Sequence, residues 1–127
     1  MKKLFLLFAY ASFISFNQIN AQFTNVMIDD ISGPNEPSIA INPLNTNEIV
    51  AGSNIQNSYY SSDGGATWFT GFINSTLGEA GDPCLVADSA GNFFYFHLVN
   101  GLDKVACQKS TDGGFSYNDG SYSWNNN

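Results

Sequence analysis

The chain has 127 residues and is acidic, with 11 Asp and Glu against 4 Lys and Arg and a formal net charge of −7 at pH 7. Such a surface repels phosphate backbones and anionic lipid headgroups, so binding to nucleic acid or to an acidic membrane is disfavoured. Hydrophobic residues make up 43% of the chain and aromatic residues 15%, which is enough for a packed core and argues against disorder.

The first 21 residues have the pattern of a secretory signal peptide. Lys2 and Lys3 precede an apolar run from Leu4 to Phe16 that is too short to span a bilayer, and Ala21 offers a small residue for cleavage. The alternative is an N-terminal anchor helix. We therefore expect a chain that is secreted, periplasmic or at the cell surface after cleavage near Ala21, without a membrane span.

Residues 22–35 are expected to form either a leading strand or a linker. Residues 23–28 favour a strand, and the breakers Gly33 and Pro34 end the segment. No partner strand is visible nearby in the sequence.

Residues 36–80 form the first of two similar units. Short runs of strand-favouring residues alternate with Gly, Pro, Asn and Asp, and no apolar period of 3.6 residues follows the signal, which predicts an all-β fold. The four expected strands cover residues 38–41, 48–53, 58–61 and 67–73.

The turn before the fourth strand has an unusual composition. The turn has Ser61, Asp63, Gly65 and Thr67 at every second position, and Trp68 directly follows Thr67. Asp63 can accept hydrogen bonds from backbone N–H groups of the turn, and Gly65 permits a positive φ. Trp68 carries much more apolar area than a turn needs, so we expect it to pack against a neighbouring sheet.

Residues 81–127 repeat this plan. Pro83–Asp88 corresponds to Pro37–Asn42 at an offset of 46 positions, and the expected strands cover residues 83–88, 93–99, 104–108 and 117–124. The second turn repeats the first at an offset of 49 positions. Its residues are Ser110, Asp112, Gly114, Ser116 and Tyr117.

Both turns resemble the Asp box, Ser-x-Asp-x-Gly-x-Thr-Trp, of bacterial neuraminidase repeat and sialidase-like β-propellers. The second copy departs from this motif, with Ser116 in place of Thr and Tyr117 in place of Trp. The resemblance implies a partial β-propeller of about two four-stranded antiparallel blades, residues 36–80 and 81–127, the second one truncated. It also implies that the boxes are structural and lie away from the substrate pocket. Propellers typically need four to eight blades, so we expect further blades from a longer chain or self-association.

Cys84 and Cys107 lie on the first and third strands of the second unit. Neighbouring strands are about 4.8 Å apart, so these strands are about 9.6 Å apart, beyond the roughly 7 Å limit between the Cα atoms of a disulfide. We predict two unpaired, largely buried thiols.

The end of the sheets opposite the Asp boxes collects the polar residues that are candidates for function. Glu36 and Asp82 precede the equivalent prolines, and they are weak candidates for a general acid and base or for cation binding. Alternatively, they satisfy N–H groups of their own turns. Side chains expected at the same end are Asn54, Gln56, Asn57, Asn100 and Asp103.

Two classes of function follow from the resemblance. A parent chain could be an exo-sialidase-like glycoside hydrolase, or the propeller could be a non-catalytic binding or scaffold module of a larger secreted protein. The sequence contains no arginine, so the arginine cluster of sialidases has no counterpart here, and this chain alone is expected to be inactive. We expect a glycan as ligand and no cofactor. His97, the sole histidine, has no Cys or His at metal-ligand spacing, so we expect it to be structural and predict no metal site.

Overall fold

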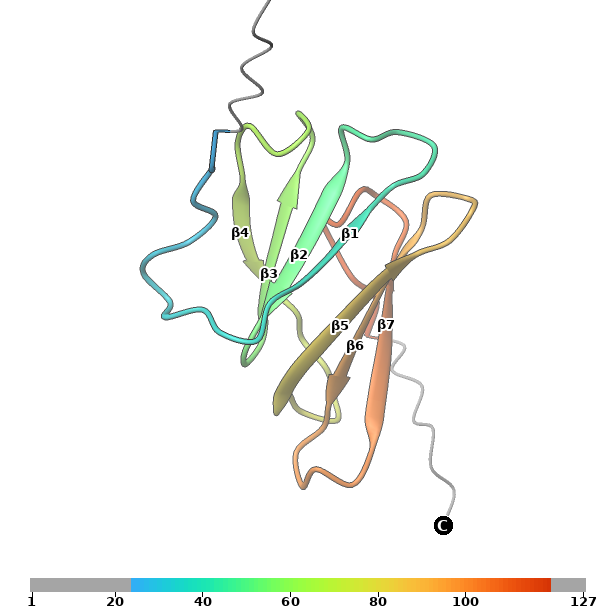
Figure 1. The fold of residues 1–127 in the computed structure, drawn as a ribbon. Coiled ribbons are helices and arrows are strands. Elements are labelled where there is room, and N and C mark those ends of the chain that lie inside the picture. The colour runs from blue at the N-terminus through green and yellow to red at the C-terminus, as the bar shows by residue number, and fades with distance from the viewer. Residues whose placement is uncertain (1–23, 120–127) are drawn as a thin grey trace, which may run out of the picture.

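The computed structural model describes residues 24–119, which form two antiparallel sheets without a helix (Figure 1). Sheet A contains, in spatial order, β1 (Ser38–Ile41), β2 (Ile49–Ser53), β3 (Asn57–Ser61) and β4 (Phe69–Phe72). Sheet B contains β5 (Gly81–Ala87), β6 (Phe93–Leu98) and β7 (Val105–Ser110). The all-β prediction is confirmed for these residues. The predicted signal peptide lies outside them.

Two predicted strands are absent from the described residues. Residues 24–28 form no strand, because no neighbouring strand pairs with them, and Val26 and Met27 are exposed. The strand expected over 117–124 is not formed at 117–119, and its remainder lies outside the described part of the chain. Asn118 nevertheless bonds to the edge of β7: its N–H donates to the Lys109 carbonyl, and its Oδ1 accepts from the Lys109 N–H.

The core lies between the two sheets, and both contribute to it. Its buried residues are Ala40, Val50 and Ile73, with Leu85, Phe93 and Tyr95 from sheet B. In Figure 1, β1 and β5 lie side by side where the sheets meet. Hydrogen bonds also join the two sheets: the Leu85 N–H donates to Ser38 Oγ (2.9 Å), and Tyr95 Oη donates to the Asn57 carbonyl (3.0 Å).

The strand registers define which positions of the two sheets are equivalent. Ile39 pairs with Ala51 in sheet A, and Leu85 pairs with Tyr95 in sheet B. Leu85 and Tyr95 point into the core, whereas Ile39 is 58% exposed on the face of sheet A that points away from sheet B. Equivalent faces therefore point in the same direction, and the sheets stack as successive units rather than as a back-to-back pair.

The two cysteines flank a common neighbour, because Cys84 on β5 and Cys107 on β7 both pair with Phe96 on β6. The predicted strand order is correct, and both thiols are free. The prediction that they are largely buried is wrong. Cys84 is exposed and Cys107 is half-buried, because both lie on the face of sheet B that points away from sheet A.

Candidate functional site

The two ends of the sheets carry different loops, as the strand order predicts. At one end the β3–β4 turn meets the β1–β2 turn, where the Gly64 N–H donates to the Asn47 carbonyl (3.0 Å). At the other end the β2–β3 loop meets the start of β1, where the Asn54 N–H donates to the Asn35 carbonyl (3.1 Å). The two turns that resemble the Asp box, which are called the Asp boxes below, lie at the first end. The candidate residues Glu36 and Asp82 lie at the second.

The two Asp boxes form the same set of hydrogen bonds. In the first, Asp63 accepts from Ser61 Oγ (2.8 Å), from the Thr67 N–H (2.9 Å) and from Thr67 Oγ1 (2.6 Å). In the second, Asp112 accepts from Ser110 and Ser116 at the same three distances. Each carboxylate is thus occupied by donors of its own turn, and this leaves little capacity for chemistry on a ligand.

These hydrogen bonds stabilise the charged form of both carboxylates. Donation by Thr67 and Ser61 lowers the pKa of Asp63 to about 2. For Asp112, burial acts to raise the pKa, but the bonds from Ser116 and Ser110 outweigh it, so the pKa is lowered. Both groups therefore stay ionised at neutral pH, as a turn that relies on carboxylate acceptors requires.

The aromatic residues that end the two boxes lie in different surroundings. Trp68 is half-buried, donates from Nε1 to the Gly65 carbonyl of its own turn (3.0 Å), and is not among the partly buried residues packed against the described core. Tyr117 packs edge-on against Tyr95 (5.7 Å between centroids) beside the core. The second box lies against sheet A, where a Cβ at Gly114 would meet Val50 and Tyr60.

At the opposite end, the side chain of Asn54 links the two candidate acids. Its Nδ2 donates to Glu36 Oε2, and its Oδ1 accepts from the Asp82 N–H (2.6 Å). Glu36 and Asp82 have φ values of 51° and 53° and each precedes a proline. A left-handed conformation of a residue with a side chain costs about 1–2 kcal/mol. Because this conformation occurs at both Glu36 and Asp82, which are equivalent positions, we regard this end of the sheets as a candidate functional site.

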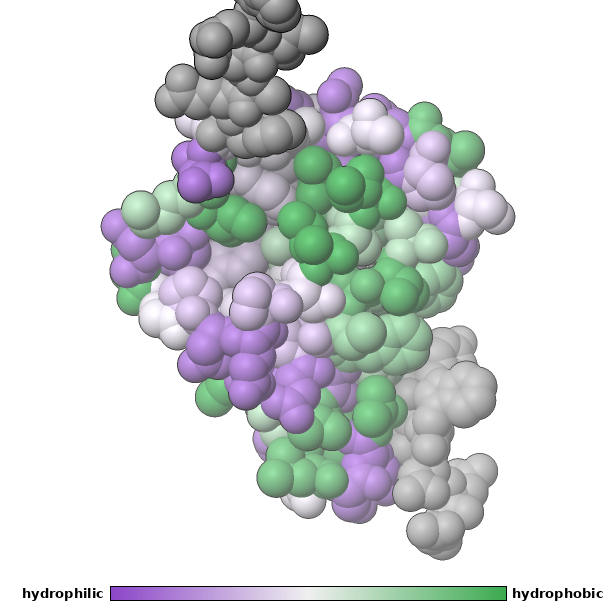
Figure 2. Space-filling view, viewed as in Figure 1, coloured by the Kyte–Doolittle hydropathy of each residue, from purple (hydrophilic) through white to green (hydrophobic). Residues whose placement is uncertain are grey.

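An open cleft of about 570 Å³ lies beside this bridge. Amide, hydroxyl and carboxylate side chains dominate its lining, which consists of Ser32, Gly33, Asn35, Asn54, Ile55, Gln56, Asn57 and Glu79. Ile55 is 57% exposed and adds an apolar surface. Figure 2 shows hydrophilic side chains gathered where the β2–β3 loop meets the starts of β1 and β5. Such a lining can donate to and accept from a neutral, hydroxyl-rich ligand.

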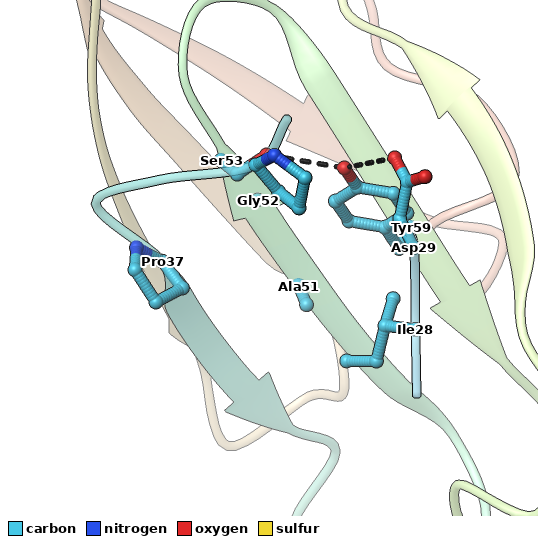
Figure 3. A pocket seen from close by; sticks show the side chains of 8 residues that line it. Ile28, Asp29, Pro37, Ala51, Gly52, Ser53 and Tyr59 are labelled. Atoms are coloured by element: carbon cyan, nitrogen blue, oxygen red, sulfur yellow. Dashed lines mark hydrogen bonds between the residues drawn. The ribbon is translucent and has the colours of Figure 1, made fainter. Parts of the chain in front are cut away.

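A second cavity, of about 170 Å³, lies between the N-terminal segment and sheet A (Figure 3). Tyr59 Oη lies 3.1 Å from Ser53 Oγ and donates to Asp29 Oδ2 (2.8 Å). Asp29 also accepts from the Ile31 N–H, and these bonds lower its pKa to about 2, whereas burial raises the pKa of Tyr59. The segment is therefore tied to the sheet as a covering loop. This contact is not predictable from local sequence, because residues 29 and 59 are far apart in the chain.

Other predicted residues lie outside the cleft lining. Asn100 and Asp103 belong to the β6–β7 loop, where the Asn100 N–H donates to the Leu77 carbonyl (3.3 Å). His97 is buried, and its Nδ1 lies 2.9 Å from the Leu98 carbonyl. Within residues 24–119, no group of three or more His, Cys, Asp or Glu could hold a metal ion. The same residues contain no helix that is long and apolar enough to cross a membrane.

Comparison of the chain with family models, with curated proteins and with solved structures gives no match.

Proposed function

We propose that this chain belongs to a secreted Asp-box β-propeller that binds carbohydrate at the cleft beside Glu36, Asn54 and Asp82. The observation that carries the proposal is the amide-rich lining of this cleft, which offers donors and acceptors without a basic side chain. The two matching Asp boxes and the stacking of the sheets in one direction support the repeat architecture. Asn54 positions the first strands of both units at this end.

Binding rather than catalysis is the function that this chain supports. Glycoside hydrolysis generally uses two carboxylates on either side of the scissile bond. Here one oxygen of Glu36 already accepts from Asn54, and the sequence contains no arginine to hold an acidic sugar. A neutral oligosaccharide therefore fits the cleft better than a sialic acid does.

The test is an NMR titration of the purified protein with neutral and sialylated oligosaccharides. We expect neutral sugars to shift the amide signals of Asn54, Gln56 and Asn57, and Gln56→Ala to weaken binding about tenfold, which corresponds to about 1.4 kcal/mol. Asn47→Ala, which removes an exposed amide at the Asp-box end, is the matched control and should bind normally. An absence of shifts at the cleft, or equal binding by both variants, contradicts the proposal.

A further inference from the structure

Residues 29–35, which we call the strap, border both the cleft and the smaller cavity. Ser32, Gly33 and Asn35 line the cleft of about 570 Å³. Asp29 and Pro34 line the cavity of about 170 Å³. The position of the strap therefore sets the shape of both spaces.

The strap has few attachments to the sheets. At one end Tyr59 Oη donates to Asp29 Oδ2 (2.8 Å, Figure 3), and at the other end the Asn54 N–H donates to the Asn35 carbonyl (3.1 Å). Residues 30–34 are exposed, and within the part of the chain that the structure describes no hydrogen bond joins them to either sheet. Segments with an exposed backbone and few tertiary contacts open locally at a low cost in free energy.

The Asp29 carboxylate connects the turn of the strap to sheet A. Its Oδ1 accepts from the Ile31 N–H (2.8 Å) and the Ser32 N–H (3.2 Å), and its Oδ2 accepts from Tyr59. Tyr59 is only 2% exposed, so its hydroxyl is a donor fixed by the sheet. A hydrogen bond to a charged acceptor stabilises more than one between neutral groups. This bond is therefore the main attachment of the first half of the strap.

The same bond belongs to a network that reaches the cleft. Tyr59 Oη lies 3.1 Å from Ser53 Oγ, and Ser53 Oγ accepts from Asn57 Nδ2 (3.2 Å). Asn57 lines the cleft and also donates to the Asn54 carbonyl (2.7 Å). One set of hydrogen bonds thus orients an amide of the cleft and holds the strap.

We propose that the strap is a movable wall of the carbohydrate cleft and that the hydrogen bond from Tyr59 to Asp29 holds it closed. Opening withdraws Ser32 and Gly33 from the cleft, so a ligand that contacts them binds the closed form and stabilises it. The role of the hydrogen bond rests on the geometry of the strap alone, whereas the effect of a sugar rests on the proposed function.

The first test is limited proteolysis with an endoproteinase that cleaves before aspartate. The bond before Asp30 must leave the sheet to enter the protease, so its cleavage measures opening. Tyr59→Phe removes the hydroxyl but keeps the ring, and cleavage before Asp30 should be at least about tenfold faster than in the wild type. Cleavage before Asp112, in the second Asp box, measures global unfolding, and the result is the rate before Asp30 relative to it.

The matched control is Tyr60→Phe. Tyr60 is the next residue of β3 and packs against Phe69 and Phe115 on the opposite face, so this variant should be cleaved like the wild type. Asp29→Ala removes the other partner of the bond without changing the core, and should also open the strap. Its rate is compared with that of a peptide of residues 24–36 that carries the same change. Equal cleavage of the wild type and Tyr59→Phe, or equal acceleration by Tyr60→Phe, overturns the proposal.

The second test repeats the cleavage of the wild type with a neutral oligosaccharide. If the sugar binds only the closed form, cleavage before Asp30 should slow about tenfold at a concentration of about nine times Kd. A sugar that binds without slowing this cleavage overturns the assignment of the strap as a wall of the cleft. A sugar that does not bind contradicts the proposed function alone, and the tyrosine variants still decide whether the hydrogen bond holds the strap.

Discussion

Gly65 and Gly114 occupy the same position in the two Asp boxes, but their surroundings differ. Both have positive φ, 88° and 91°. A Cβ at Gly65 would lie 3.6 Å from its nearest neighbours, whereas one at Gly114 would lie 2.1 Å from Val50 Cγ1. The first turn requires glycine for its backbone conformation alone. The second also requires it so that the turn can lie against sheet A.

Alanine substitutions should separate these two requirements. We expect Gly65→Ala to destabilise by about 1–2 kcal/mol through backbone strain, and Gly114→Ala by about 1–3 kcal/mol more because it overpacks the contact with Val50. Gly71→Ala, at a strand position where a Cβ meets only the Ser58 carbonyl at 3.8 Å, is the control and should have little effect. Urea unfolding measures all three, and equal losses for Gly65 and Gly114 would show that the second turn does not press on sheet A.

Asp63 should make stability depend on pH in the acid range. Its folded pKa, about 2, lies below the ordinary value of 3.8 because of the bonds from Thr67 and Ser61. The stabilisation that it provides is therefore fully present above about pH 4 and is lost as the pH falls toward 2. We expect the melting temperature of the wild type to fall over this window, and that of Asp63→Asn to start lower and fall less steeply.

The control for this measurement is Asp30→Asn, a change at an exposed aspartate outside the Asp boxes. Its melting temperature should follow the wild-type pH dependence, because Asp63, Asp29, Asp88 and Asp112 keep their lowered pKa values. If Asp63→Asn has the same slope as the wild type between pH 4 and 2, the hydrogen bonds of the first box do not stabilise the folded chain.

The reactivities of the two cysteines test how the strands of sheet B are arranged. The exposed Cys84 and the half-buried Cys107 lie on opposite sides of Phe96. Burial raises the pKa of the Cys107 thiol, so less of the reactive thiolate is present at a given pH. We expect Cys84 to react faster with iodoacetamide near pH 8. Peptide mass spectrometry measures the two rates.

Cys84→Ser provides the control, since only the slow reaction should remain in this variant. Titration of the denatured, unreduced protein should find both thiols free. Faster labelling of Cys107 would contradict its greater burial, and a disulfide between the two residues would contradict the strand order of sheet B.

The strands were predictable from sequence wherever local chemistry determines them. β1 lies at residues 38–41 as expected, and the turn residues set the other boundaries to within about two residues. Of the two alternatives for residues 22–35, the strand is not formed at 24–28, because its strand-favouring residues have no neighbouring strand. Asn54, Gln56 and Asn57 lie in the cleft at the end of the sheets where the sequence places them. The contact of Asp29 with Tyr59, the hydrogen bonds of the Asn54 side chain and the other cleft residues were missed for a related reason. They depend on which loops the packing brings together, and local sequence carries no such information.

The stability of each sheet depends on the other sheet. The core takes residues from both, and Tyr95 donates across the contact to the Asn57 carbonyl. A single sheet of three or four short strands exposes one apolar face and is marginal without a cover. The chain should therefore unfold in one cooperative step that includes both sheets.

The adjacent residues Leu85 and Val86 test this dependence, since they point to opposite faces of β5. Leu85 is 5% exposed in the core, so Leu85→Ala should destabilise the whole chain by about 2–5 kcal/mol. Hydrogen exchange should then accelerate in β2 and β3 of sheet A as much as in β6, because these amides exchange through global opening. Val86→Ala, at a position 44% exposed on the outer face, is the matched control and should change exchange little. If Leu85→Ala accelerates exchange only in sheet B, the two sheets are independent units and the shared core contributes little to the stability of sheet A.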